Sequence, residues 1–251
     1  MLIIVGIGVD NEKDITIKGL EIVKQADFVY LETYTSKLNC PVSALEKIYE
    51  KRIILADRDL VENRAEGILE KAKTKNVAFL VAGDPFGATT HTDLYLRAVQ
   101  DGIKVKVIHN ASIINAIGEI GLQLYKFGKT TSLVFPEEKY QPESAYDILK
   151  ENKSIGAHTL VLLDIKNEEN KFMTVNEAIK RLLEIEEKRK EKVFTKDTLC
   201  IGVARFGSDN QKIKAGSAKK LLNEDFGLPL HSLIVPEKLH FMEEEMLKLW
   251  E

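Results

Sequence analysis

Hydrophobic residues recur along the chain in two alternating patterns. Short apolar runs predict buried β-strands, and longer stretches with apolar residues three or four positions apart predict amphipathic helices. The predicted strands are residues 2–5, 28–31, 52–55, 77–81, 105–108, 159–164, 199–204 and 232–235. The predicted helices are residues 16–26, a helix opening at 43, and residues 60–73, 92–100, 111–120, 143–151 and 175–190.

Local signals mark several helix starts. Thr16 or Asp14 is available as the N-cap of the first helix. The sequences TVNE at 174–177 and SALE at 43–46 both have the spacing of a capping box. Each is therefore expected to open a helix.

Strands separated by helices of this length build a mostly parallel α/β sheet. The alternation falters over residues 127–142, a polar stretch that contains Gly128, Pro136 and Pro142. We therefore expect a fold of class α/β with two α/β domains of unequal style, residues 1–128 and residues 129–251.

Composition describes an ordinary soluble protein with an apolar core. The 251 residues are 44% hydrophobic and 30% charged. Lys and Arg number 36 against 39 Asp and Glu, a net charge of −3, which argues against a protein whose main task is to grip nucleic acid. No apolar stretch approaches the ~20 residues of a membrane span, and no secretory leader is visible. The chain is expected to be intracellular.

Cysteine and histidine usage gives no sign of a metal centre. Cys40 and Cys200 lie far apart without a C-x-x-C spacing, which excludes a zinc ribbon or an iron–sulfur cluster and suits a reducing cytosol. Cys200 lies in an apolar strand and is expected in the core. No pair of histidines with a nearby carboxylate suggests a metal site.

Two glycine patterns resemble phosphate-binding loops only in part. Gly6 and Gly8 follow the first strand, but Asn11 stands where a dinucleotide fingerprint needs a third glycine. These glycines indicate either a ligand close to the backbone or simply a tight turn. The sequence GKT at 128–130 lacks the earlier glycine of a phosphate loop, because position 123 is Gln.

The segment GDPFGATTH at 83–91 is more informative. It follows the most hydrophobic strand, and ligands of open α/β sheets bind beyond the carboxyl ends of strands. Asp84 offers an acceptor for an amine or hydroxyl, or alternatively forms a turn before Pro85. Thr89 and Thr90 offer hydroxyl groups, and His91 either faces a ligand or caps the next helix.

A third strand end carries HNASI at 109–113. Ser112 and the free N–H groups of the following turn are suited to hold a polar ligand group, and the alternative is a simple helix cap. His158 and His240 are interpreted as surface or satisfied core residues, and His231 stays open. Residues and spacing alone thus predict a two-domain α/β protein that binds a small ligand at its strand ends.

Longer segments resemble a known family. The resemblance is carried by VGIGVDNEKDITIKGLEIVKQADFVYLETYTS, VAGDPFGATTHTDLYLRA, HNASIINAIGEIGLQLYKFG, HTLVLLDIK, FMTVNEAIKRLLEIEE, ARFGS and LPLHSLIVPEKLHFMEEEML. Together they resemble the diphthine synthases, a branch of the tetrapyrrole-methylase class. The resemblance extends from Met1 to about Leu247.

This resemblance implies a methyltransferase. The family uses S-adenosyl-L-methionine and releases S-adenosyl-L-homocysteine, with the cofactor in the cleft between two α/β domains of the tetrapyrrole-methylase type. Its substrate is translation elongation factor 2, in which a histidine carries a 3-amino-3-carboxypropyl group. The amino nitrogen is methylated repeatedly to give diphthine, in diphthamide biosynthesis. A cytoplasmic homodimer is implied, and the compact length resembles archaeal members, which favours three methyl groups.

The resemblance also assigns residues. Thr16, Glu32, Tyr34 and Thr35 are expected to line the substrate cleft, and Gly87 replaces a bulkier residue, so its contact is expected through the backbone. No general base is assigned; Asp84 and His231 are the candidates to test. The implied cofactor contacts are Val9, Asp84, Gly87, Ser112, Ile113, Leu163, Ala204 and His231.

Two alternatives share these features. A tetrapyrrole C-methyltransferase would use the same cofactor and loop with a different substrate pocket. A non-catalytic nucleotide-binding module belongs to another class, and a calorimetric titration without cofactor binding would favour it.

Overall fold

The computed structural model describes residues 1–138 and 140–251. The chain divides into two compact units, unit 1 with Met1–Ala116 and unit 2 with Ile117–Glu251. The sequence places the change of domain at 128/129, and the irregular stretch used for that prediction includes residue 139, which lies outside the described residues. No helix in the described part of the chain has the length and apolarity needed to span a membrane.

Unit 1 contains a five-stranded sheet in the order β3-β2-β4-β1-β5, and all its strand pairs are parallel. The strands are β1 (Leu2–Gly6), β2 (Phe28–Glu32), β3 (Ile53–Ala56), β4 (Val77–Val81) and β5 (Val105–Ile108). The helices are α1 (Ile17–Gln25), α2 (Val42–Tyr49), α3 (Glu66–Thr74), α4 (Thr92–Gln100) and α5 (Ile113–Ala116).

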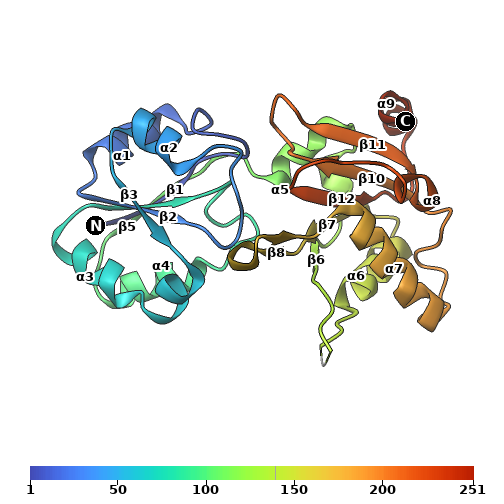
Figure 1. The fold of residues 1–251 in the computed structure, drawn as a ribbon, viewed down its shortest axis with the longest axis horizontal. Coiled ribbons are helices and arrows are strands. Elements are labelled where there is room, and N and C mark those ends of the chain that lie inside the picture. Colours follow the sequence, from blue (N-terminus) through green and yellow to red (C-terminus); the bar gives the residue numbers. More distant parts are fainter. Residues whose placement is uncertain (139) are drawn as a thin grey trace. The chain divides into compact units, whose positions relative to one another are not determined.

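Both faces of this sheet are covered, as expected for parallel strands. Val5 and Leu80 pack with residues of α1 and α2, such as Val23. Ile4 and Phe79, which point to the other face, pack with residues of α3 and α4. Figure 1 shows α1 and α2 on one face of the sheet and α3 and α4 on the other.

Unit 2 contains a mixed sheet in the order β11-β10-β12-β7-β6, in which only the β6–β7 pair is parallel. Its strands are β6 (Thr131–Leu133), β7 (Thr159–Leu163), β10 (Leu199–Ala204), β11 (Lys212–Ser217) and β12 (His231–Val235), with a separate hairpin of β8 (Ile165–Lys166) and β9 (Lys171–Phe172). Its helices are α6 (Ser144–Ser154), α7 (Val175–Arg189), α8 (Ala218–Leu221) and α9 (Phe241–Leu247).

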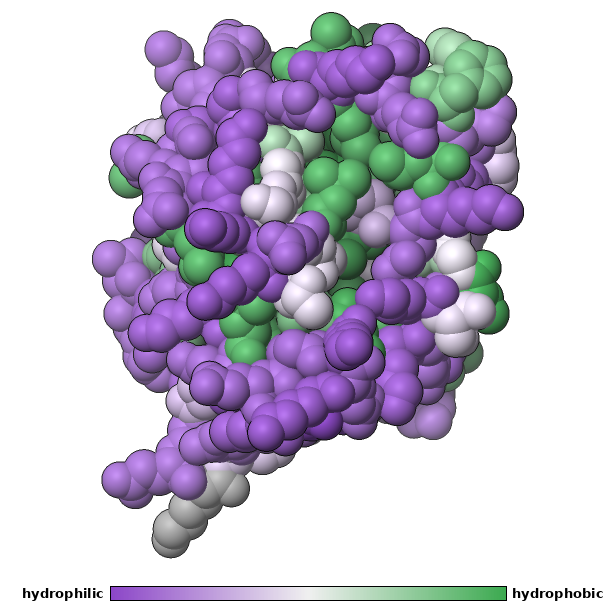
Figure 2. All heavy atoms as spheres, turned by 90° about the vertical axis from the view of Figure 1, so that its right-hand side faces the viewer, coloured by the Kyte–Doolittle hydropathy of each residue, from purple (hydrophilic) through white to green (hydrophobic). Residues whose placement is uncertain are grey.

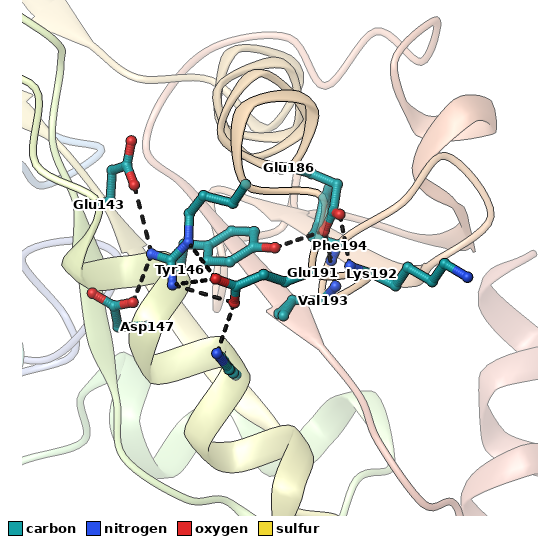
Figure 3. Close-up of polar contacts among 10 residues, drawn as sticks. Glu143, Tyr146, Asp147, Glu186, Glu191, Lys192, Val193 and Phe194 are labelled. Atoms are coloured by element: carbon teal, nitrogen blue, oxygen red, sulfur yellow. Dashed lines mark hydrogen bonds and ion pairs between the residues drawn. The ribbon is translucent and has the colours of Figure 1, made fainter.

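A half-buried carboxylate network fastens the end of α7 to α6 (Figure 3). Glu186 accepts hydrogen bonds from the backbone N–H groups of residues 192, 193 and 194, at 2.7, 2.8 and 3.0 Å. It also accepts from the Tyr146 hydroxyl at 2.7 Å. Desolvation raises the pKa of Glu186, but these hydrogen bonds outweigh it and hold the pKa below its usual value. The chain turning back after α7 is thus held by one side chain.

Most predicted elements are confirmed. Residues 77–81, 92–100, 105–108 and 199–204 form β4, α4, β5 and β10 with the predicted bounds. Thr16 caps α1, and Thr174 with Glu177 forms the predicted capping box of α7. Cys200 is fully buried, as predicted.

The capping box at 43–46 is wrong. Helix α2 begins at Val42, directly after Pro41, because proline fits the residue before or at the start of a helix, where its missing N–H costs nothing. The Glu46 carboxylate instead accepts from the Ile53 N–H at 2.9 Å, which joins α2 to β3.

Two predicted helices are shorter than expected. Residues 60–73 split into a π-helical turn (Asp59–Asn63) and α3, because the Arg64 N–H bonds the carbonyl of Asp59 five residues back. Residues 111–120 give α5 and then a 3₁₀ turn that ends before Gly121, whose φ of 96° terminates the helix. The sequence pattern missed β6, the β8–β9 hairpin, β11, α8 and α9.

Candidate functional site

Loops after β1, β4 and β5 meet at one edge of the unit 1 sheet. Gly83 donates to the Gly8 carbonyl at 2.6 Å, and Gly8 donates to the Gly83 carbonyl at 3.3 Å. A Cβ on Gly6 would lie 2.6 Å from the Gly83 carbonyl oxygen. The glycines therefore let two strand-end loops approach each other, which is the tight-turn alternative for Gly6 and Gly8.

Asp84 lies at the centre of this edge, and its side chain is 18% exposed. Its carboxylate accepts from the Phe86 N–H at 3.0 Å, the His109 ring at 2.8 Å and the Asn110 N–H at 3.2 Å. Burial raises the pKa of Asp84, but these hydrogen bonds outweigh burial and lower it below the usual value. The carboxylate is therefore ionised, forms the turn, and has acceptor capacity left for a ligand.

Gly87 and Ser112 lie close together on neighbouring loops. A Cβ on Gly87 would lie 2.8 Å from the Ser112 hydroxyl oxygen, so a side chain at 87 would cover it. The Ser112 N–H donates to the Asn115 side chain at 2.8 Å, so Asn115 caps the turn that Ile113 begins. The Ser112 hydroxyl thus remains the polar group of this turn that faces Gly87.

Val9 is held in place by the residues after β1. Its N–H and that of Asp10 both donate to the Asp14 carboxylate, at 3.1 and 2.8 Å. Gly8, immediately before, has a φ of 84° and lacks room for a Cβ, which would clash with Asp14. The backbone at Val9 is therefore fixed beside the Gly8–Gly83 pairing.

In unit 2, Leu163, Ala204 and His231 lie at one edge of the sheet. Ala204 at the end of β10 pairs directly with His231 at the start of β12. Ser232 pairs with Leu162, which places Leu163 beside the start of β12 on the other side. The register thus brings these three predicted site residues together.

The His231 imidazole is bound within unit 2. Its Nδ1 accepts from the Val175 N–H at 3.3 Å, and its Nε2 lies 3.0 Å from the Leu228 carbonyl oxygen. Burial lowers the pKa of His231, which keeps the ring neutral. Since Nδ1 accepts and Nε2 donates, the ring has no lone pair left for a substrate proton.

A second group of polar residues lies beyond β2. The Glu32 carboxylate accepts from the Tyr34 N–H at 2.5 Å and from the Thr35 hydroxyl at 2.6 Å. Burial raises the pKa of Glu32 despite these bonds. Thr16 is occupied as the cap of α1, so of the four residues expected to line a substrate cleft, Glu32, Tyr34 and Thr35 are those brought together.

His91 lies beneath Tyr34 and is 1% exposed. Among the described residues, neither of its ring nitrogens has a hydrogen-bond partner, and Nε2 is 3.9 Å from Glu32. Burial lowers the pKa of His91 to about 4. It occupies the N-cap position of α4 without a capping hydrogen bond, so the predicted side-chain cap is wrong. The other two histidines are as predicted: His158 is buried and bonded to Glu243, and His240 caps α9.

Tyr34 forms one wall of a pocket in unit 1 with a volume of about 250 Å³. Glu62, on the π-helical turn, and Thr90 are further polar walls. Sequence reasoning missed Glu62, because a glutamate in a charged segment looks like any solvated residue.

These features fit S-adenosylmethionine. An ionised carboxylate suits hydroxyl or amino groups, and glycine loops with a serine hydroxyl suit close approach of a polar ligand. The described residues that would hold it in unit 1 are Val9, Asp84, Gly87, Ser112 and Ile113. No cluster of His, Cys, Asp and Glu suited to a metal ion is found over residues 1–138 and 140–251.

Comparison with known proteins gives the class first. The sequence model of the tetrapyrrole (corrin/porphyrin) methylases matches residues 1–222. A crystal structure of a diphthine synthase superposes with a TM-score of 0.91 at 38% identity, covering 99% of this chain and 95% of that one. The two sheets are therefore those of a methylase fold.

Full-length relatives then narrow the class. The diphthine methyl ester synthase of Dictyostelium discoideum is 53% identical, over 98% of this chain and 96% of its own length. The diphthine synthase of Methanococcus maripaludis is 49% identical, over 99% and 98%. The chain belongs to the diphthine synthases of the tetrapyrrole methylase family. It is a methyltransferase that depends on S-adenosylmethionine.

Proposed function

We propose that this enzyme N-methylates the 3-amino-3-carboxypropyl-histidine of translation elongation factor 2, repeatedly, to give diphthine. The observation that carries the proposal is full-length identity of about half to relatives named for diphthine synthesis. The strand-end site supports it, because it offers an ionised Asp84 and a serine hydroxyl for a polar cofactor.

We propose that residues of both units contact the cofactor: Val9, Asp84, Gly87, Ser112 and Ile113 of unit 1 and Leu163, Ala204 and His231 of unit 2. His231 contributes its backbone, since both ring nitrogens are already bonded. Once bound by these residues, S-adenosylmethionine would supply a sulfonium methyl group: an N–C bond to the substrate amine would form as the C–S bond breaks, with S-adenosylhomocysteine as the leaving group and no need for a metal.

The attacking amine must first lose a proton, because an ammonium has no lone pair. Neither candidate base suits that step. The lowered pKa of Asp84 makes its carboxylate a weak proton acceptor, and the His231 ring has no free lone pair. The role left to the protein is to bind the amine in a favourable orientation, which contributes on the order of 7–11 kcal/mol in well-oriented reactions.

Intact-mass spectrometry tests the proposal. Elongation factor 2 carrying the aminocarboxypropyl-histidine, incubated with enzyme and S-adenosylmethionine, is expected to gain mass in methyl steps. Factor without that precursor should gain none. Cofactor binding without any gain would refute the substrate and turn attention to tetrapyrrole precursors.

The plateau of that experiment also decides the methyl count. Three methyl groups correspond to the amine alone, and a fourth to an added carboxyl ester. The relative from Dictyostelium discoideum named as a methyl ester synthase favours the ester as a second candidate. Chain length does not decide, because that relative is almost as short as this chain.

We further propose a cytoplasmic homodimer without direct nucleic-acid binding. Figure 2 shows hydrophobic side chains gathered between hydrophilic ones on one face. Unit 2 exposes large hydrophobic residues that a second copy would cover, namely Tyr125, Ile155, Phe241, Met242 and Leu249. Light scattering should give twice the monomer mass, and a monomer at micromolar concentration would refute the dimer.

A further inference from the structure

The Tyr34 pocket is an unassigned cavity near the strand-end site of unit 1. Its volume is about 250 Å³, and its walls are Tyr34, Val61, Glu62, Thr90, Asp93 and Leu94. Thr90 belongs to the same β4–α4 loop as Asp84. The pocket therefore opens beside the carboxyl edge of the sheet, where ligands of such folds bind.

Its polar groups are poorly satisfied within the protein. The Tyr34 hydroxyl lies 3.4 Å from the Thr90 hydroxyl, and that hydroxyl lies 3.5 Å from the Glu62 carboxylate. Both distances are long for O–H···O hydrogen bonds. Two hydroxyl groups, each with one proton to donate, and one carboxylate thus face one another at distances too long for strong hydrogen bonds, and acceptor lone pairs are left for a ligand.

Two opposite charges flank Tyr34 without ion-pair partners. Within the described chain, neither the Glu62 carboxylate nor the Arg58 guanidinium makes an ion pair closer than 4.0 Å. Arg58 lies over the Tyr34 ring, 5.3 Å from its centroid. By contrast, Asp93 is neutralised by Arg97 at 2.7 Å, and Arg97 also donates to the Glu62 carbonyl. Over the residues that the structure describes, Glu62 is therefore an anion of the pocket wall without an ion pair. Arg58 is not part of the wall: it lies over the Tyr34 ring, and its charge also favours the ionised form of Glu32.

Glu62 also lies on an unusual backbone. The turn Asp59–Asn63 is π-helical. This conformation is rare in proteins, and where it occurs it is often found at a functional site. The Arg64 guanidinium holds the first residue of this turn through Asp59 at 2.6 Å. The turn presents Glu62 to the pocket, where a regular helix was predicted.

We propose that this pocket binds the amino-acid end of the substrate side chain, with Glu62 and the Tyr34 and Thr90 hydroxyls accepting from its amino group and Arg58 donating to its carboxylate. The inference rests on the proposed function, whose substrate carries an amino group and a carboxylate on one carbon. Val61 and Leu94 pack against its methylene groups. A guanidinium suits a carboxylate because it donates two parallel hydrogen bonds.

Kinetics with the protein substrate tests the assignment. Glu62→Gln and Arg58→Met should each raise the KM for elongation factor 2 bearing the precursor by about tenfold, as expected for one charged hydrogen bond. The dissociation constant for S-adenosylmethionine should stay unchanged. Glu66→Gln and Arg52→Met, which remove the same charges from exposed positions outside the pocket wall, should behave as wild type.

A small probe molecule shows which amino-acid group binds in the Tyr34 pocket. The two candidates are the side chain of the modified histidine in the substrate and the methionine part of the cofactor. 2-Aminobutanoate should inhibit competitively against elongation factor 2 and not against S-adenosylmethionine, and butylamine or butanoate alone should be weaker. Loss of cofactor affinity in Glu62→Gln, with an unchanged KM for the protein, would assign the pocket to the cofactor and overturn the proposal. An unchanged KM in both variants would overturn it as well.

The test does not depend on the proposed substrate. If wild-type enzyme leaves elongation factor 2 unmethylated, the proposed function fails. Saturation-transfer NMR of 2-aminobutanoate with the whole protein still examines the pocket. Binding that Glu62→Gln abolishes would support an amino-acid pocket, and no binding to wild type would refute it.

Discussion

Gly8 and Gly102 both adopt a left-handed backbone, with φ of 84° and 70°, but only Gly8 is crowded. A methyl group at 102 meets no atom within 4 Å, whereas one at 8 collides with Asp14. Gly102→Ala should therefore cost about 1 kcal/mol, the price of the backbone conformation alone.

Gly8→Ala should cost more, because Asp14 must move away from the N–H groups that it accepts from. Urea denaturation gives both values, and calorimetry should show weaker S-adenosylmethionine binding for Gly8→Ala only. Equal costs and equal cofactor affinities would mean that the Gly8 loop has no special role.

His91 makes folding sensitive to acid. Its pKa is about 4 in the folded protein, because burial opposes the charge, against 6.5 for a free imidazole. The unfolded chain binds the extra proton first, so stability is full above pH 6.5 and falls as pH drops toward 4.

The substitution His91→Phe removes the pH-dependent contribution of His91 to the free energy of unfolding. Relative to the variant, wild type should lose about 2 kcal/mol in free energy of unfolding between pH 7 and pH 5. Urea titrations at both values measure the difference. Because Glu32 lies 3.9 Å from the His91 ring and its pKa is raised by burial, both proteins carry Glu32→Gln in this comparison. If both proteins had the same pH dependence of stability, the pKa of His91 would be equal in the folded and unfolded states, contrary to this prediction.

At the scale of elements, Glu186 is expected to hold the end of α7. Glu186→Gln should cost about 2 kcal/mol, since an amide cannot accept from three N–H groups and a hydroxyl as an anion does. Glu187→Gln, on the exposed next position, should cost almost nothing.

The Glu186 contribution also depends on pH. Because its folded pKa is lowered, its stabilisation is present above the pKa of the unfolded carboxyl and is lost as pH falls through the folded value. Wild type and Glu186→Gln should therefore converge in stability on acidification, and a constant difference would contradict the assignment.

Sequence patterns predict the elements of this chain where burial is uniform. The run at 77–81 is apolar throughout and gives β4 with its predicted bounds. The pattern fails where one local contact decides, as at Arg64, which ends a π-helical turn, or at Pro41, which starts α2. It also misses β11, whose buried and half-buried residues alternate between lysines.

The residues of the candidate site also fall into those that the sequence predicts and those that it does not. Asp84 and Ser112 follow strands and are found from the sequence as strand-end residues. The pairing of Ala204 with His231 needs the antiparallel register, which no short motif encodes. Arg58 and Glu62 carry no sequence signal at all, because only the fold brings them beside Tyr34.

At the scale of the whole molecule, the two units have separate hydrophobic cores. Phe79 packs entirely within unit 1, and Phe226 within unit 2. Phe79→Ala should cost about 3–5 kcal/mol, a loss confined to unit 1 if the units open independently.

Native-state hydrogen exchange measures whether the loss of stability is confined to unit 1. In Phe79→Ala, amides of β1, β2 and β4 should exchange faster, while those of β7, β10 and β12 keep their protection. Phe226→Ala should give the reverse pattern. Loss of protection in both sheets from either substitution would show a single cooperative unit.

Each sheet is also drawn from one continuous stretch of chain, with no strand contributed by the other unit. During synthesis on the ribosome, all five strands of the first sheet are available for pairing once β5 has left the exit tunnel. Translation of residues 117–251 then takes on the order of ten seconds. The nascent N-terminal half therefore has time to bury its apolar strands before the second half exists, which shortens the period in which chaperones must shield them.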